Sequence, residues 1–287
     1  MQVEMNGLPV FADTGGRVFV PDLPTLVFIH GAQHDHFVWK PLVTRFADAG
    51  RNMLAVDLPG HGRSGGPPLN SIESLAEWLV ALLVKVGAEA ASSGGGPAVG
   101  GGVASASGAE TAPVVLVGHS MGSLIALEAA ARLPGQVRHL VMVGTAIPMP
   151  VAPALLDAAR DDEPKAMALI NRWSNSPLAA RGAVGGHGLW LPAINLRIME
   201  RQPPGVLYND LAACNAYMHG PAALAQLSCP VTIVAGTADR MTPVKAAHSL
   251  AAQIPNAQLI ELENVGHALL AEAPAAVGTA IADALNP

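Results

Sequence analysis

The segment GHSMG, residues 118–122, is the strongest candidate for catalytic chemistry in this sequence. It follows the apolar run VVLVG and precedes a stretch rich in Ala and Leu, which predicts a sharp turn from a buried strand into a helix. Such a turn needs very small residues two positions before and after its serine, as Gly118 and Gly122 provide. The turn would expose Ser120 at the carboxyl end of the strand as a nucleophile.

A serine hydroxyl is a weak nucleophile at neutral pH and needs a general base. We expect this base to be His267, in the segment ENVGHALL, because it follows the last predicted strand and an imidazole exchanges protons near neutral pH. The motif histidines His30, His61 and His119 occur too early in the chain. A fourth, His248, falls within a predicted helix.

The base in turn needs a carboxylate that holds its tautomer and stabilises the imidazolium. Asp239, in VTIVAGTADRMTP, follows a strand and precedes a predicted helix, and it lies between the serine and the histidine in the chain. An aspartate at such a place is otherwise often a turn or capping residue. Asp210 and Glu263 are weaker alternatives.

Acyl transfer also needs hydrogen-bond donors for the developing oxyanion. The backbone amide of Met121, directly after the serine, is one expected donor. We expect the second to be the backbone amide of Ala32, because Gly31 lets the chain after an early strand turn sharply toward the site.

The elements that must position these groups alternate along the chain. Apolar runs predict strands at residues 25–30, 52–58, 114–118, 137–145, 231–236 and 257–262, and helical spacing falls at 39–48, 75–86 and 121–132. Alternation of this kind predicts an α/β fold with a mostly parallel sheet and helices on both faces. Asn6-Gly7 between two apolar runs predicts an antiparallel hairpin at one edge.

Two segments interrupt this alternation. Residues 87–112 are mostly Gly, Ala and Ser, a composition that buries too little surface to offset its ordering entropy, so we expect a flexible insertion. Residues 148–228 contain helical stretches broken by Pro and Gly. Their large side chains either line an apolar pocket that the segment covers or pack the segment on itself, and the candidate residues are Trp173, Trp190, Met199, Tyr208 and Met218.

Composition excludes several classes of protein. Of 287 residues, 51% are apolar and 13% are charged, which excludes disorder throughout the chain. Lys plus Arg number 16 against 22 for Asp plus Glu, giving a net charge of −6, so the basic surface of a nucleic-acid-binding protein is missing.

The sequence also allows predictions about membrane insertion and cellular location. Residues 139–156 carry no formal charge, but three prolines interrupt them, so we expect a buried strand followed by a loop and no stable membrane insertion. The N-terminus has no basic start and no long apolar run, which predicts a cytoplasmic protein without a signal peptide. Cys214 and Cys229 fit no metal spacing and are expected as thiols. We expect no cofactor and no metal.

The motifs together resemble those of the α/β-hydrolase fold superfamily, particularly its serine esterases and lipases. The matching segments are HGAQHDHFVW, DLPGHGRS, GHSMG, GTADRMTP and the Gly-His pair at 266–267, in the family's order. The resemblance implies that DLPGHGRS is a structural turn, so Asp57 and His61 take no part in the chemistry. It also implies a helical cap at 148–228, inserted between core parts at 1–147 and 229–287.

The resemblance implies a serine hydrolase that cleaves a carboxylic ester through an acyl-enzyme intermediate. Serine in the nucleophile position argues against the dehalogenases and epoxide hydrolases of this superfamily, which use aspartate. Hydrolysis of a carbon–carbon bond and cofactor-free haloperoxidase or perhydrolase chemistry stay open. So does a ligand receptor that keeps the triad but turns over slowly.

We expect the partner to be a small-molecule ester with a small-to-medium, mainly apolar acyl group. The few charges in the predicted cap favour this, although one of its arginines could bind a carboxylate. The candidates for that role are Arg160, Arg172, Arg181, Arg197 and Arg201. His34 and His36 follow the predicted oxyanion donor, and we expect them on the surface. The oligomeric state cannot be inferred from the sequence.

Overall fold

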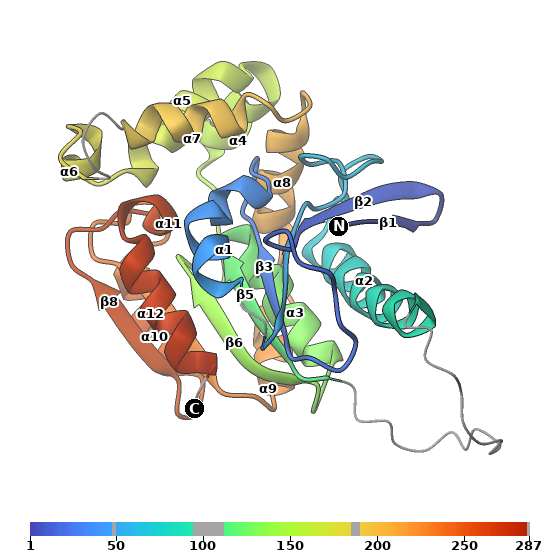
Figure 1. Cartoon of the computed structure of the whole chain (residues 1–287). Helices are drawn as coiled ribbons and strands as arrows, with labels where there is room; N and C mark the ends of the chain where they lie inside the picture. Colours follow the sequence, from blue (N-terminus) through green and yellow to red (C-terminus); the bar gives the residue numbers. More distant parts are fainter. Residues whose placement is uncertain (48–49, 94–111, 185–189, 286–287) are drawn as a thin grey trace, which may run out of the picture.

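The computed structural model describes residues 1–47, 50–93, 112–184 and 190–285 (Figure 1). Its sheet has eight strands in the order β1-β2-β4-β3-β5-β6-β7-β8. The strands are β1 Gln2–Met5, β2 Leu8–Asp13, β3 Thr25–Ile29, β4 Asn52–Val56, β5 Val114–His119, β6 Val137–Val143, β7 Val231–Gly236 and β8 Gln258–Leu262. All pairings from β4 to β8 are parallel, and β2 joins the sheet antiparallel to β4.

The predicted hairpin forms β1 and β2. Asn6 and Gly7 have φ angles of 53° and 77°, both in the left-handed region. Two such residues make the tight turn whose twist matches that of the flanking strands. This prediction is therefore confirmed.

Helices cover both faces of the sheet, as predicted (Figure 1). Helices α2 Ile72–Ser93, α3 Met121–Arg132 and α10 Val244–Ala251 contribute to one apolar core. The 3-10 helix η1 His36–Trp39, α1 Lys40–Phe46, α11 Leu269–Glu272 and α12 Pro274–Leu285 contribute to the other. Strands β3 to β7 are apolar and almost continuously buried because helices cover both of their faces.

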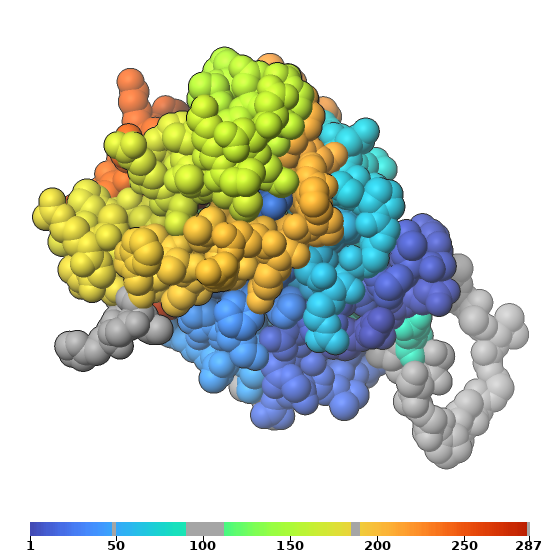
Figure 2. All heavy atoms as spheres, turned by 90° about the horizontal axis from the view of Figure 1, so that it is seen from above, coloured from blue at the N-terminus to red at the C-terminus, as the bar shows by residue number. Residues whose placement is uncertain are grey.

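The predicted helical cap lies between β6 and β7. Its helices are α4 Pro153–Asp161, α5 Glu163–Ser174, α6 Pro177–Ala180, α7 Leu191–Met199, α8 Val206–Ala216 and α9 Gly220–Ala225. Helices α4, α5, α7 and α8 share a small apolar core of their own. In Figure 2 the residues of the cap, coloured yellow-green to orange, cover much of the face of the molecule that is seen from above. The last helix, α9, contributes Ala223 to the core around α3.

Two further sequence predictions can be compared with the structure. The predicted insertion at 87–112 begins too early, because residues 87–93 continue α2 and residues 94–111 lie outside those described. For 139–156 the predicted buried strand is β6, which ends at Val143, and the predicted loop ends earlier than expected because α4 begins at Pro153. Among the described helices, none is sufficiently long and apolar to cross a membrane. Cys214 and Cys229 are free thiols.

Candidate active site

The turn between β5 and α3 has the predicted strained geometry. Ser120 caps α3 with φ 54° and ψ −121°, a conformation that non-glycine residues rarely adopt. A Cβ on Gly118 would lie 2.2 Å from the carbonyl oxygen of Gly122, and one on Gly122 would lie 2.2 Å from that of Ile29. The two glycines therefore allow the helix to begin against β3, which fixes the place of Ser120.

His267 and Asp239 form a buried hydrogen-bonded pair. The Nδ1 atom of His267 lies 2.7 Å from Oδ2 of Asp239. The other carboxylate oxygen, Oδ1, accepts the backbone N–H groups of Met241 and Thr242, each at 2.8 Å. Burial by itself raises the pKa of Asp239, but the charge and hydrogen bond of His267 and the bonds from Thr242 outweigh it and lower this pKa. Asp239 is thereby held as a carboxylate beside the imidazole.

Sequence reasoning missed Thr242. Its hydroxyl donates to Oδ2 of Asp239 at 2.8 Å and lies 3.1 Å from Nδ1 of His267. The only available signal was a threonine three residues after an aspartate, a spacing found in many turns. Thr242 thus orients the carboxylate toward the imidazole.

Neither alternative acid reaches His267. Asp210 pairs with His61 at 2.8 Å, and Glu263 accepts a weak hydrogen bond from Thr237 at 3.4 Å. Asp239 is therefore the carboxylate that geometry places beside the predicted base.

Ser120 and His267 approach the same stretch of chain. The N–H of Ser120 donates to the carbonyl of Val143 at 2.9 Å. A Cβ on the next residue, Gly144, would lie 3.2 Å from Nδ1 of His267. Among the described residues, no hydrogen bond joins the Ser120 hydroxyl to His267. The structure therefore places both residues at the end of β6, and a hydrogen bond between a predicted nucleophile and its base often tightens only with substrate bound.

The two predicted oxyanion donors flank Ser120. Gly31 approaches so closely that a Cβ on it would lie 3.1 Å from that of Ser120. We find no acceptor for the N–H of Ala32 within the described part of the chain. Met121 is the first residue of α3, where N–H groups have no helical acceptor. Both amides could thus bind an anionic oxygen next to the serine.

A second histidine, His119, supports the loop that carries His267. Its Nε2 lies 2.9 Å from the backbone oxygen of His267, and the two rings are 5.0 Å apart. Because a carbonyl only accepts, Nε2 of His119 must carry the proton. Burial and the nearby His267 lower the pKa of His119 to about 3. A neutral ring therefore positions His267 without adding a competing charge.

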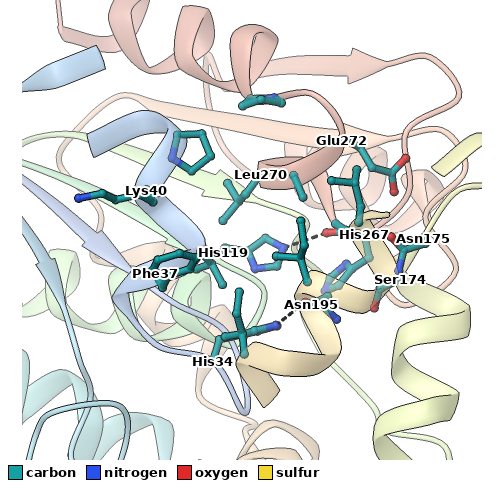
Figure 3. A pocket seen from close by; sticks show the side chains of 18 of the residues that line it. His34, Phe37, Lys40, His119, Ser174, Asn175, Asn195, His267, Leu270 and Glu272 are labelled. Carbon is teal, nitrogen blue, oxygen red and sulfur yellow. Dashed lines mark hydrogen bonds between the residues drawn. The ribbon is translucent and has the colours of Figure 1, made fainter. Parts of the chain in front are cut away.

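A cavity of about 680 Å³ opens beside His267 and His119 (Figure 3). In this view Phe37 and Lys40 lie on one side of it, and Ser174, Asn175 and Glu272 lie on the other. Apolar side chains dominate the lining, including Val38, Leu191, Ile194, Ile198 and Leu270. The cavity reaches the imidazole, while Ser120 is not among its lining residues. A ligand in this cavity would lie beside His267, the predicted base.

The predicted lining residues of the cap are wrong. Trp190 and Met218 are 56% and 74% exposed, and Met199 is fully buried in the core of the cap. Trp173 and Tyr208 are also absent from the lining. Helix α7 supplies the apolar wall instead, because the face that a cap helix turns toward the site depends on its packing.

The two loop histidines differ from the expectation of surface exposure. His34 lines the cavity, and its Nε2 lies 2.8 Å from Oδ1 of Asn195 on α7. Burial lowers its pKa, which favours the neutral ring. His36 is half-buried and bonds Asp57 through Nδ1 at 2.8 Å.

None of the five candidate arginines lines the cavity. Arg160 pairs with Asp157 and Asp161 on the surface, and Arg201 pairs with Asp35 at 2.7 Å. The cation at the cavity is Lys40, which is half-exposed and 3.4 Å from Asp13. No arginine therefore supports a carboxylate-binding role.

Among the residues that the structure describes, one group of side chains has the composition and spacing of metal ligands. Donor atoms of Asp35, His36 and Asp57 lie within 4.8 Å of one another. However, Asp57 accepts hydrogen bonds from His36 and from the N–H of Arg63, and Asp35 is paired with the guanidinium of Arg201. Their oxygens already have partners, so this cluster serves to join loops.

Comparison with known proteins places the chain in a family. The model of the "Alpha/beta hydrolase family" matches residues 26–280. The chain belongs to the alpha/beta hydrolase family. The expected superfamily and fold are therefore confirmed.

Curated relatives of this hydrolase include two proteins named pimeloyl-[acyl-carrier protein] methyl ester esterase. One, from Aromatoleum aromaticum, is 28% identical in an alignment 264 residues long that covers 85% of this chain and 91% of that protein. The other, from Stenotrophomonas maltophilia, is 31% identical in an alignment 258 residues long that covers 85% of this chain and 86% of that protein.

Solved structures agree on the fold. The enol-lactonase from Burkholderia xenovorans has a TM-score of 0.79 at 19% identity, with both chains covered completely. An esterase from Exiguobacterium antarcticum has a TM-score of 0.77 at 15% identity, covering 98% of this chain and 97% of that chain. At these sequence identities the structural similarity supports the assignment of the fold alone.

Proposed function

We propose that this hydrolase cleaves carboxylic esters through an acyl-enzyme intermediate, with Ser120 as nucleophile, His267 as general base and Asp239 as its carboxylate partner. The observation that carries the proposal is the 2.7 Å contact between Nδ1 of His267 and Oδ2 of Asp239, beside a serine in a strained turn. Ester hydrolysis is also the activity in the names of the curated relatives.

In this mechanism Ser120 attacks the ester carbonyl while Nε2 of His267 takes its proton. The amides of Ala32 and Met121 stabilise the tetrahedral oxyanion. His267 then protonates the leaving alkoxide, and a water molecule activated by the same imidazole hydrolyses the acyl-enzyme. Asp239 stabilises the imidazolium in both halves of the reaction.

The proposed substrate is a small-molecule ester with a small-to-medium, mainly apolar acyl group. The cavity volume of about 680 Å³ lies within the range of small-molecule sites, and α7 gives it an apolar wall. The relatives' names favour a methyl ester of a chain of intermediate length. A cytoplasmic location belongs to the same proposal and is supported by the two free cysteines.

Labelling with a fluorophosphonate tests the activated serine. We expect the wild-type protein to be labelled and Ser120→Ala to be unlabelled. Ser174→Ala is a matched control because Ser174 lines the cavity that His267 also lines and has no proposed role in the chemistry. A wild-type protein that takes up no label, or a Ser120→Ala protein that still does, would contradict the assignment of the nucleophile.

A panel of p-nitrophenyl and methyl esters of increasing chain length then tests the reaction. We expect multiple turnovers, with the best rates on apolar acyl groups of short to intermediate length. Preferred turnover of a dienoic diketone would indicate a carbon–carbon hydrolase instead. A single turnover on every ester would indicate a receptor.

A further inference from the structure

The loop that carries the proposed oxyanion donor Ala32 is tied to the cap through a buried carboxylate. Oδ2 of Asp210, on α8, accepts the backbone N–H of Gln33 at 2.9 Å. The same oxygen lies 2.8 Å from Nε2 of His61, and both of these side chains are 1% exposed. Asp210 therefore joins a cap helix to two core loops at one atom.

His61 is fixed in its charged form by its two partners. Its Nδ1 lies 2.9 Å from the carbonyl oxygen of Pro59, and its Nε2 faces Asp210. Both partners only accept hydrogen bonds, so both ring nitrogens must carry protons. Burial by itself lowers the pKa of His61, but the charge and hydrogen bond of Asp210 outweigh it and raise this pKa. Asp210 and His61 thus form a buried ion pair.

The core holds the other side of Ala32. Nδ1 of His30 lies 2.8 Å from the carbonyl oxygen of Gly31, while its Nε2 accepts the N–H of Leu58 at 3.1 Å. Since Nε2 accepts, Nδ1 carries the proton and donates to Gly31. That carbonyl belongs to the same planar peptide unit as the N–H of Ala32, so fixing one fixes the direction of the other.

Gln33 has a backbone conformation that needs such support. Its φ of 57° lies in the left-handed region, which is unfavourable for a residue with a side chain. Besides the bond from its N–H to Asp210, its side-chain amide donates to the carbonyl of Met199 at 3.1 Å. The cap therefore holds Gln33 by its backbone and by its side chain.

We propose that Asp210 is a positioning residue that fixes Gln33 from the cap and so aims the N–H of Ala32 at the oxyanion. The inference rests on the proposed function, since it concerns the same reaction. Asp210 touches neither substrate nor the reacting atoms in this role. A misdirected donor raises the barrier to the tetrahedral intermediate and leaves substrate binding almost unchanged.

Replacement of Asp210 tests this inference. Asp210→Ala should lower kcat by about 10- to 100-fold, with KM changed by less than about threefold, because a displaced donor weakens binding of the transition state alone. A trifluoromethyl ketone, which forms a tetrahedral oxyanion on the serine, should lose affinity by a similar factor. Asp210→Asn keeps an acceptor for Gln33 and should retain more of the rate than Asp210→Ala.

Tyr217→Phe is the matched control. Tyr217 donates from the cap to the buried Glu128 at 2.7 Å, whereas Gln33 bonds Asp210, Glu163 and Met199, so loss of the Tyr217 hydroxyl should lower the melting temperature without lowering kcat. An Asp210→Ala protein that folds and has an unchanged kcat, whether or not its KM is raised, overturns the inference. If this variant does not fold, Asp210→Ser, whose hydroxyl oxygen stands one bond short of the carboxylate oxygens and so cannot reach the N–H of Gln33 in the same way, is judged by the same change in kcat. Failure of the wild-type protein to cleave any ester would instead contradict the proposed function.

Discussion

Nδ1 of His267 and Oδ2 of Asp239 lie 2.7 Å apart, and the hydroxyl of Thr242 contacts both groups. The carboxylate thus accepts four hydrogen bonds in a buried place. This arrangement fixes the tautomer of His267 with Nε2 free to accept a proton.

Replacing Asp239 with Asn should remove most of the activity. An amide can present its N–H to Nδ1 and favour the wrong tautomer, so we expect kcat to fall by about 10⁴-fold. The rate of p-nitrophenyl ester hydrolysis measures this effect. Glu263→Gln, which changes the exposed alternative acid, should retain full activity, and a comparable loss there would contradict the assignment.

Thr242→Val should have a smaller effect of the same kind. The variant removes one hydrogen bond to the carboxylate, and we expect kcat to fall by about tenfold, since such bonds contribute about 1.5–3 kcal/mol. Thr242→Ser keeps the hydroxyl and should restore the rate. Equal activity of the valine and serine variants would show that the hydroxyl is dispensable.

Gly122→Ala should unfold the protein or destabilise it by about 3 kcal/mol or more. Its Cβ would lie 2.2 Å from a backbone oxygen of β3, and backbone cannot move aside cheaply. Gly87→Ala is the control, because it lies in α2 with no atom within 4 Å of the new Cβ. Urea unfolding should show that this control is unchanged or stabilised, by up to about 1 kcal/mol.

His119 should make the protein less stable in acid. Its pKa is about 3 when folded and about 6.5 when unfolded, so between these values only the unfolded chain binds the proton. As the pH is lowered through this range, this group should therefore decrease the free energy of unfolding by up to about 1.4 kcal/mol per pH unit. His119→Asn should show a shallower fall between pH 6.5 and 5 in urea titrations; a parallel curve would refute the burial argument.

Ile194→Trp should shift the substrate preference toward shorter acyl chains. Ile194 lies on the cavity wall and is 38% exposed, so a larger side chain can enter the cavity without disturbing a core. We expect kcat/KM to fall more for long esters than for short ones. Arg197→Trp, on the exposed side of α7, should leave the profile unchanged.

The local parts of the site could be predicted from the sequence. The turn at Ser120 depends on a strand, a helix and two glycines within a few residues of the serine, and all of these could be predicted from the local sequence. Ser120, Asp239 and His267 each follow a predicted parallel strand. Because parallel strands place their carboxyl ends at one edge of the sheet, the three residues could be expected at that edge.

The cavity lining could not be predicted in this way. Trp190 and Met218 are large and apolar, but they are exposed and do not line the cavity. Leu191 and Ile194 line it from α7. Which face of a short amphipathic helix meets the site depends on its packing against its neighbours, and no local pattern encodes it.

The sequence by itself therefore determined the sheet, the inserted cap and the residues in which catalysis is proposed. Only the tertiary structure decided how these residues are held. Asp210 reaches Gln33 across 177 positions of the chain, and Thr242, in the same turn as Asp239, meets His267 across 25 positions. Such contacts form where distant loops meet, so their geometry depends on the packing of the whole chain.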